Sequence, residues 1–444
     1  MNRRTFVGLI AVTSIIACIV VCSGVARAAD HQAFQTPPIQ LGTSGGNAKD
    51  ITSMYCCSGT LGALVTDGSA QYILSNNHVL ALSNEGSPED PITQPGLIDT
   101  RCGRDDYNVV ANLTAWMPIS FDGSTNYVDA AIAQVLPGMV SEDGSILGIG
   151  TISSETRAPR ARLRVKKSGR TTGVTSGRIQ GIGVTVTVWY SDECGGPSNM
   201  SAVFDNQMII GGGGFSAGGD SGSVVVENVN DSPRAVGLLF AGSASYTLAN
   251  PIDAVLSDLG GLSMVGGGVE PPPPPPGTGT ITGTVLDSQT RDPISAARVK
   301  TDSGQSTKTD ESGVYTLTDV PAGECTVTAS AKGYQTFSQT ASVPDEGTVD
   351  VSFELAPKTT GKPSSKSQAH VTGIDRAIEV KKRNDEMLLG HSSVVGTGVG
   401  IANNGRIAIQ VYLNQEEPGT RGRLPKVIDN IPVQVIVTGP FVAY

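Results

Sequence analysis

Six consecutive prolines, Pro271–Pro276, divide this chain into parts that must fold separately. Such a run adopts an extended polyproline II helix without internal hydrogen bonds, and it acts as a semi-rigid spacer. A second polar stretch, residues 357–370, lacks hydrophobic periodicity. Because 444 residues also exceed what one hydrophobic core serves, we expect three folded units. They span residues 29–266, 278–356 and 371–444, with linkers at 267–277 and 357–370.

The first 28 residues have the pattern of an export signal. Arg3 and Arg4 precede the apolar stretch Phe6–Val21, and the small-residue string at 26–28 follows it. The pattern predicts cleavage after Ala28 and a secreted or periplasmic protein with no membrane contact beyond the signal. An uncleaved membrane anchor is the alternative, because the apolar stretch is long for a signal peptide.

Charge and cysteine usage narrow the range of partners. The 31 basic and 41 acidic residues give a formal charge of −10, without a basic cluster interleaved with aromatic residues, so nucleic acid is not an expected partner. The cysteines lack paired C-x-x-C spacing and no two histidines lie together, so we expect no metal or other cofactor. Cys56 and Cys57 are too close for an unstrained bridge, which favours a disulfide from one of them to Cys102 or Cys194.

Secondary-structure patterns predict a mainly β protein. The first unit has short runs of Val, Thr and Ile bounded by Gly, Asn, Asp and Ser, and the middle unit alternates apolar and polar residues in period two. The middle unit therefore predicts a small β-sandwich. In the last unit, a helix over 374–389 and a hairpin formed by 394–401 and 407–413 predict a small α+β unit.

The string Gly-Gly-Asp-Ser-Gly at 218–222 supplies a candidate nucleophile, Ser221. A serine hydroxyl needs a nearby base, a carboxylate that orients the base, and amide donors for the oxyanion. The glycines allow a tight loop in which the amides of Gly219 and Ser221 form that oxyanion hole.

The base and its orienting carboxylate follow by elimination. His31 lies beside the cleavage site, and two other histidines follow the proline run, which leaves His78. Asp129 precedes a small-residue apolar strand, where a buried carboxylate needs donors such as the His78 imidazole. Asp99 and Asp122 are the alternatives.

The order His, Asp, Ser resembles that of the chymotrypsin/trypsin-like serine peptidase superfamily. The strings at 72–78 and 129–132 stand where that superfamily has its catalytic His and Asp, and 165–177 looks like the start of its second barrel. The resemblance implies a double β-barrel and a secreted endopeptidase that acts on proteins or peptides through an acyl-enzyme. More narrowly, residues 59–259 are similar to a bacterial group related to the plant narrow-leaf peptidases.

The same resemblance implies where specificity and control lie. Residues 236–242 would line the primary specificity pocket, which assigns Phe215, Phe240 and Gly242 to it. Trypsin-type members carry an Asp where Phe215 stands, so cleavage after Lys or Arg is not expected. The 394–435 segment precedes the peptidase in many narrow-leaf relatives and follows it here, and we consider that the 371–444 unit docks on the cleft.

The middle unit resembles the carboxypeptidase-regulatory-like domain. The residues that carry this resemblance are the strings at 283–287, 293–299, 309–315 and 333–334. It implies a spacer or binding module without catalytic chemistry.

Overall fold

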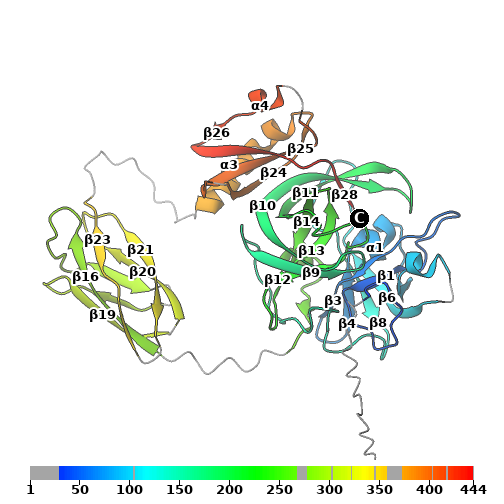
Figure 1. The fold of residues 1–444 in the computed structure, drawn as a ribbon, viewed down its shortest axis with the longest axis horizontal. Helices are drawn as coiled ribbons and strands as arrows, with labels where there is room; N and C mark the ends of the chain where they lie inside the picture. Colours follow the sequence, from blue (N-terminus) through cyan, green and yellow to red (C-terminus); the bar gives the residue numbers. More distant parts are fainter. Residues whose placement is uncertain are drawn as a thin grey trace, which may run out of the picture.

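The computed structural model describes residues 30–103, 106–267, 278–301, 304–321, 323–344, 347–357, 373–402, 404–416 and 419–443. The expected export signal at 1–28 and the proline run lie outside the described residues. The chain is mainly β, as predicted, with two barrel-forming sheets, a separate all-β middle unit and a small α+β unit (Figure 1).

The first barrel is an eight-stranded sheet in the order β15-β3-β4-β8-β6-β5-β1-β2. Aliphatic side chains such as Leu64, Ile73 and Leu113 fill its interior and are fully buried. A short helix, α1 (Asn77–Leu80), follows β4 directly. The strands are β1 (Thr43–Asn47), β2 (Gly59–Leu61), β3 (Ala63–Thr66), β4 (Gln71–Ser75), β5 (Pro91–Gln94), β6 (Asn108–Trp116), β8 (Ala131–Val135) and β15 (Ser263–Met264), with short 3₁₀ helices at Leu82–Asn84 and Leu97–Thr100.

The second barrel belongs to a twelve-stranded sheet. Its longest strands, β10 and β11, pair antiparallel, and bulges interrupt their register at several points. Bulges increase twist and bend a strand, which lets this pair curve around the barrel. The strands of this barrel are β7 (Thr125–Asn126), β9 (Arg164–Gly169), β10 (Gly173–Ser191), β11 (Ser198–Gly211), β12 (Val224–Glu227), β13 (Ala235–Gly242) and β14 (Tyr246–Pro251), and helix α2 (Ile252–Asp258) follows them.

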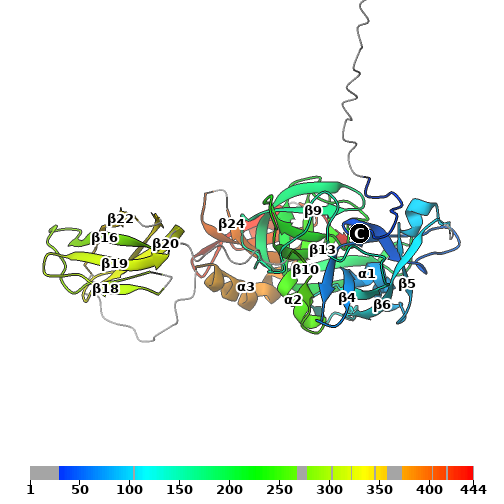
Figure 2. The same cartoon turned by 90° about the horizontal axis from the view of Figure 1, so that it is seen from below.

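The last unit continues the same sheet. Strand β24 pairs antiparallel with β10, so the order continues as β26-β27-β25-β24-β10. The predicted helix and hairpin are present as α3, β24 and β25, and α3 lies against β24 and β25 (Figures 1 and 2). The elements are α3 (Gly373–Leu389), β24 (Val394–Ile401), β25 (Ile407–Leu413), α4 (Thr420–Arg423), β26 (Val427–Ile428), β27 (Ile431–Val437) and β28 (Phe441–Ala443).

Glycines permit this close pairing. A Cβ on Gly396 would lie 2.8 Å from the Thr185 carbonyl oxygen, and one on Gly400 would lie 2.3 Å from that of Gln180. A buried lysine, Lys381 of α3, adds a polar anchor, because its Nζ donates to Thr185 Oγ1 at 2.6 Å. The glycine-rich string therefore serves the contact between β24 and β10.

The middle unit forms two four-stranded sheets that enclose their own core. Ile281, Val299 and Val327 lie in that core and are fully buried. No described helix is both long enough and apolar enough to cross a membrane. The strands are β16 (Thr278–Asp287), β17 (Arg298–Thr301), β18 (Ser306–Lys308), β19 (Val314–Pro321), β20 (Gly323–Ser330), β21 (Phe337–Val343), β22 (Thr348–Asp350) and β23 (Phe353–Leu355).

Candidate active site

His78 lies on α1, one turn beyond the end of β4. Its Nδ1 is 2.6 Å from Asp129 Oδ2, and its backbone amide donates to Asp129 Oδ1 at 3.3 Å. The Asn76 side chain donates to the Asp129 carbonyl oxygen at 2.7 Å. The strand thus ends in a tight turn that fixes both the ring and the backbone of the histidine against one aspartate.

Asp129 is fully buried just before β8, and a second side chain shares its carboxylate. The Tyr190 hydroxyl, from β10, donates to Asp129 Oδ2 at 2.9 Å. Burial raises the pKa of Tyr190 well above its usual value, and the Asp129 charge adds to that rise, so the phenol stays protonated and remains a donor. Sequence reasoning missed Tyr190 because β10 gives no local sign of which strand faces it.

The two alternative carboxylates have other partners. Asp99 binds Arg170 through two hydrogen bonds, at 2.7 and 2.6 Å. Asp122 accepts from the Ser124 amide at 2.9 Å in an exposed turn. The carboxylate that the structure places against the His78 imidazole is that of Asp129.

Ser221 lies in the loop that precedes β12, and its side chain is fully buried. Its hydroxyl donates to the Phe240 carbonyl oxygen at 3.1 Å, and its own carbonyl accepts from the Thr60 amide at 2.8 Å. The next residue, Gly222, has φ +91°, and a Cβ there would lie 2.1 Å from Ser75 Oγ at the end of β4. The loop that carries Ser221 therefore packs on the strand that leads to His78.

The two amides expected to form the oxyanion hole are those of Gly219 and Ser221. Gly219 has φ +92°, which favours glycine, and a Cβ there would lie 2.6 Å from Thr171 Oγ1. Within the described residues, neither the Gly219 amide nor the Ser221 amide donates to a protein acceptor. Both donors are therefore available to a developing oxyanion.

A buried ion pair holds this loop in place. The Asp220 carboxylate accepts from the amides of Thr171 and Ala217, at 2.9 and 3.0 Å. Lys167 Nζ, from β9, lies 3.4 Å from it, and both side chains are fully buried. Burial lowers the pKa of Lys167 and the Asp220 charge opposes that shift. Asp220 thus serves loop structure, together with a buried cation that the sequence did not identify.

The three expected specificity residues have different surroundings, although Phe240 and Gly242 share strand β13. Phe215 packs in a buried cluster with Ile179 and Met208, whereas Phe240 belongs to a second cluster beside Phe204. Gly242 pairs with Val442 of β28. Their joint role as a specificity pocket stays a prediction.

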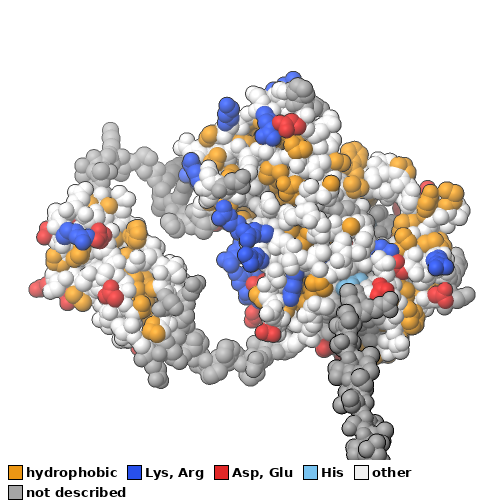
Figure 3. Space-filling view, viewed as in Figure 1, with side chains coloured by type: hydrophobic (Ala, Val, Ile, Leu, Met, Phe, Trp, Pro, Cys, Tyr) orange, Lys and Arg blue, Asp and Glu red, His pale blue; other side chains and the backbone are white. Residues whose placement is uncertain are grey.

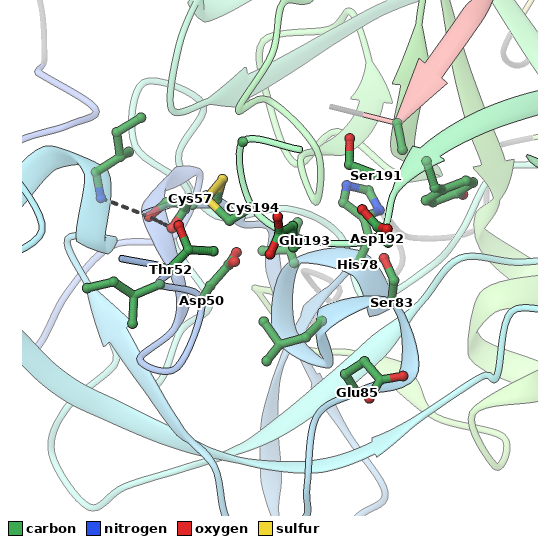
Figure 4. Close-up of a pocket in the computed structure, with 18 of the residues that line it drawn as sticks. Asp50, Thr52, Cys57, His78, Ser83, Glu85, Ser191, Asp192, Glu193 and Cys194 are labelled. Atoms are coloured by element: carbon green, nitrogen blue, oxygen red, sulfur yellow. Dashed lines mark hydrogen bonds between the residues drawn. A yellow bond between two sulfur atoms is a disulfide. The ribbon is translucent and has the colours of Figure 1, made fainter. Parts of the chain in front are cut away.

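A cavity of about 470 Å³ opens beside His78 (Figure 4). His78 and Gly219 both line it, so the imidazole and the Gly219 loop face one space. Its wall carries Asp50, Glu85, Asp192 and Glu193, with Lys49 and Arg170 as cations. Burial raises the pKa of Asp50 to about 6, and the nearby His78 charge opposes that rise.

The chain forms two disulfides in this region, and the Cys57–Cys194 bridge lines the cavity. Cys56 joins Cys102, and Cys57 joins Cys194 in the loop between β10 and β11. The sequence suggested Cys102 or Cys194 as the partner of one of the two neighbouring cysteines. Each of the two neighbours bonds one of these partners. Asp50 lies close to Cys57 and Cys194, but the two sulfurs bind each other and offer no thiolate to a metal.

Comparisons with known proteins divide the chain in two. Residues 280–356 match the carboxypeptidase regulatory-like domain. Similar solved structures include Protease A of Thermobifida fusca, with 18% identity over 52% of this chain and 99% of that chain (TM-score 0.35). A glutamic-acid-specific serine protease shares 22% identity over 51% of this chain and 100% of that chain (TM-score 0.35). Chymotrypsin of Cellulomonas bogoriensis shares 15% identity over 52% of this chain and 99% of that chain (TM-score 0.34).

A search of curated proteins found no sequence match. At these identities the likeness to solved structures concerns the fold alone, so the chemistry proposed below rests on the site's own residues.

Proposed function

We propose that this chain is a serine endopeptidase that hydrolyses proteins or peptides through an acyl-enzyme. The observation that carries the proposal is the 2.6 Å contact between His78 Nδ1 and Asp129 Oδ2, in a cavity that the Gly219 loop also lines. A serine two residues after Gly219 completes the set of groups that acyl transfer requires.

The reaction proceeds in two stages. His78 takes the Ser221 proton through its Nε2 as Oγ attacks the peptide carbonyl, and the amides of Gly219 and Ser221 bind the oxyanion. Asp129, held by Tyr190, stabilises the imidazolium, which then protonates the leaving amine. A water molecule, activated by the same base, hydrolyses the ester and restores the Ser221 hydroxyl.

Three further assignments belong to the same proposal. Phe215 supplies no carboxylate that would select Lys or Arg, so the preference is for other residues. The enzyme acts after export, in the periplasm or medium, and the 280–356 domain serves as a spacer or binding module. The kinship with the narrow-leaf group also remains part of the proposal.

Replacing Ser221 tests the nucleophile. We expect purified Ser221→Ala to lose casein hydrolysis by about 10⁴-fold or more and to stop reacting with a fluorophosphonate probe, because the attacking oxygen is gone. Ser257→Ala, an exposed serine of α2, is the matched control and should behave as wild type. Unchanged casein turnover by Ser221→Ala would overturn the proposal.

A further inference from the structure

Strand β28 fills a slot between two strands of the second barrel. On one side Val442 and Ala443 pair antiparallel with Gly242 and Ala241 of β13. On the other side the strand pairs parallel with β10, where Phe441 lies opposite Val188. A segment distant in sequence thus inserts a strand between two strands of the peptidase sheet, and strand addition is a common way of binding extended peptides.

The direction of β28 corresponds to that of a substrate. The Phe240 carbonyl accepts the hydrogen bond from Ser221, so this end of β13 lies at the nucleophile. Passing from Val442 to Ala443, the chain moves from Gly242 to Ala241, toward Phe240. In acyl transfer the residues before the scissile carbonyl also approach the nucleophile in the N-to-C direction.

The end of β28 also reaches the catalytic cavity. Ala443 lines that cavity together with His78 and Gly219. In Figures 1 and 2 the end of the red strand lies beside α1, which carries His78. The strand therefore passes along the second barrel and ends at the cavity that His78 and Gly219 line.

A buried aromatic subsite receives the first side chain of the strand. Phe441 is fully buried in a cluster that includes Tyr190, Phe204 and Phe240. The rings of Phe204 and Phe240 lie 4.9 Å apart between centroids, and those of Tyr190 and Phe204 lie 6.3 Å apart. Burying an aromatic ring contributes much of the affinity in such a groove, so this subsite favours peptides with an aromatic residue at that position.

We propose that the slot between β13 and β10 is the acyl-side substrate groove, that it selects an aromatic side chain at the position of Phe441, and that the chain's own Phe441–Ala443 segment competes for it. The proposal rests on the proposed peptidase function and adds the substrate class. Pairing of β24 with β10 tethers the segment beside the groove, and tethering gives an effective concentration in the millimolar range. External substrates therefore bind only as the segment leaves.

A binding experiment without turnover tests occupancy of the groove. The probe is an acetylated peptide with the sequence of residues 439–444, titrated by calorimetry into two full-length proteins, Ser221→Ala and Ser221→Ala/Phe441→Ala. We expect the double variant to bind at least about tenfold more tightly, since its own segment has lost the aromatic anchor. Equal binding by the two proteins, or binding by neither, would overturn the proposal. A probe with Ala in place of Phe should bind at least about tenfold more weakly, and equal affinity would refute the aromatic subsite.

Activity separates this proposal from the peptidase assignment. With Ser221 intact, Phe441→Ala should hydrolyse casein faster than wild type, whereas Val427→Ala, an exposed position of the same unit, should not. Should Phe441→Ala fail to fold, Ala443→Glu is the second variant, because its charge would repel the acidic wall of the cavity. If wild type and Phe441→Ala are both active and hydrolyse casein at equal rates, the competing segment is refuted, whereas the peptidase function is not. Folded proteins that neither hydrolyse casein nor react with a fluorophosphonate would refute the peptidase function.

Discussion

At the scale of single residues, the site depends on hydrogen bonds between distant parts of the chain. His78, Asp129 and Ser221 could be proposed from the sequence because one histidine was eligible and each type has a defined chemical role. Tyr190 and Lys167 could not, because their partners, Asp129 and Asp220, are set by strand packing. Local sequence indicates that a strand forms, and it does not indicate which side chains meet in its interior.

Tyr190 should act as a positioning residue for the Asp129–His78 pair. Tyr190→Phe keeps the ring and removes the 2.9 Å hydrogen bond to Asp129. We expect kcat to fall about tenfold with KM little changed, because substrate contacts stay intact. Steady-state kinetics on a peptide substrate provide the measurement, and Tyr107→Phe, on a different loop, serves as the control. A rise in KM with unchanged kcat would contradict this role.

Asp50 should make stability depend on pH in an unusual direction. Its pKa is raised from 3.8 to about 6, so between these values the folded state binds more protons than the unfolded state. Stability therefore falls as pH rises through this window. We expect Asp50→Asn to be more stable than wild type by about 2–3 kcal/mol near pH 8 and equal to it near about pH 3. Urea unfolding at both pH values tests this.

Asp67 serves as a control, because its pKa shifts in the opposite direction to that of Asp50. Hydrogen bonds from the amides of Ala70 and Ser69 lower the pKa of Asp67. Asp67→Asn should therefore lose stability near neutral pH, where the ionised carboxylate accepts those bonds. Equal pH responses of the two variants would contradict the burial argument for Asp50.

At the scale of elements, the sequence predicts where strands and the helix of the last unit form. It does not predict which strands pair with one another in most cases. The helix expected at 374–389 is present at Gly373–Leu389, and the expected hairpin forms β24 and β25. The pairing of β24 with β10 lay beyond sequence reasoning, since period-two alternation identifies a strand without naming its neighbour. His78 lies on α1, a short helix that the sequence did not predict.

Gly396 offers a test of that pairing. Gly396→Val would place side-chain atoms where a Cβ already lies 2.8 Å from the Thr185 carbonyl oxygen, which should separate β24 from β10. We expect faster amide hydrogen exchange over 394–401 and over the facing part of β10. Gly422→Ala is the control, because nothing lies within 4 Å of a Cβ there. Unchanged exchange in Gly396→Val would show that the pairing tolerates a side chain.

At the scale of the whole molecule, the division into three units stays a prediction, and the fold redistributes the charge of the chain. A chain with a formal charge of −10 presents basic side chains together over the second barrel (Figure 3). Exposed Arg164 and Arg178 are cross-strand partners there. Sequence order separates these residues, whereas antiparallel pairing brings them side by side. The expectation that nucleic acid is not a partner stays a prediction.

The Cys57–Cys194 disulfide has a topological consequence. It closes a covalent ring with a sequence separation of 137, and this ring contains His78 and Asp129 while Ser221 lies outside it. A single backbone cut within the ring opens it without dividing the molecule. A molecule nicked once there by a protease therefore keeps His78, Asp129 and Ser221 covalently linked through the disulfide.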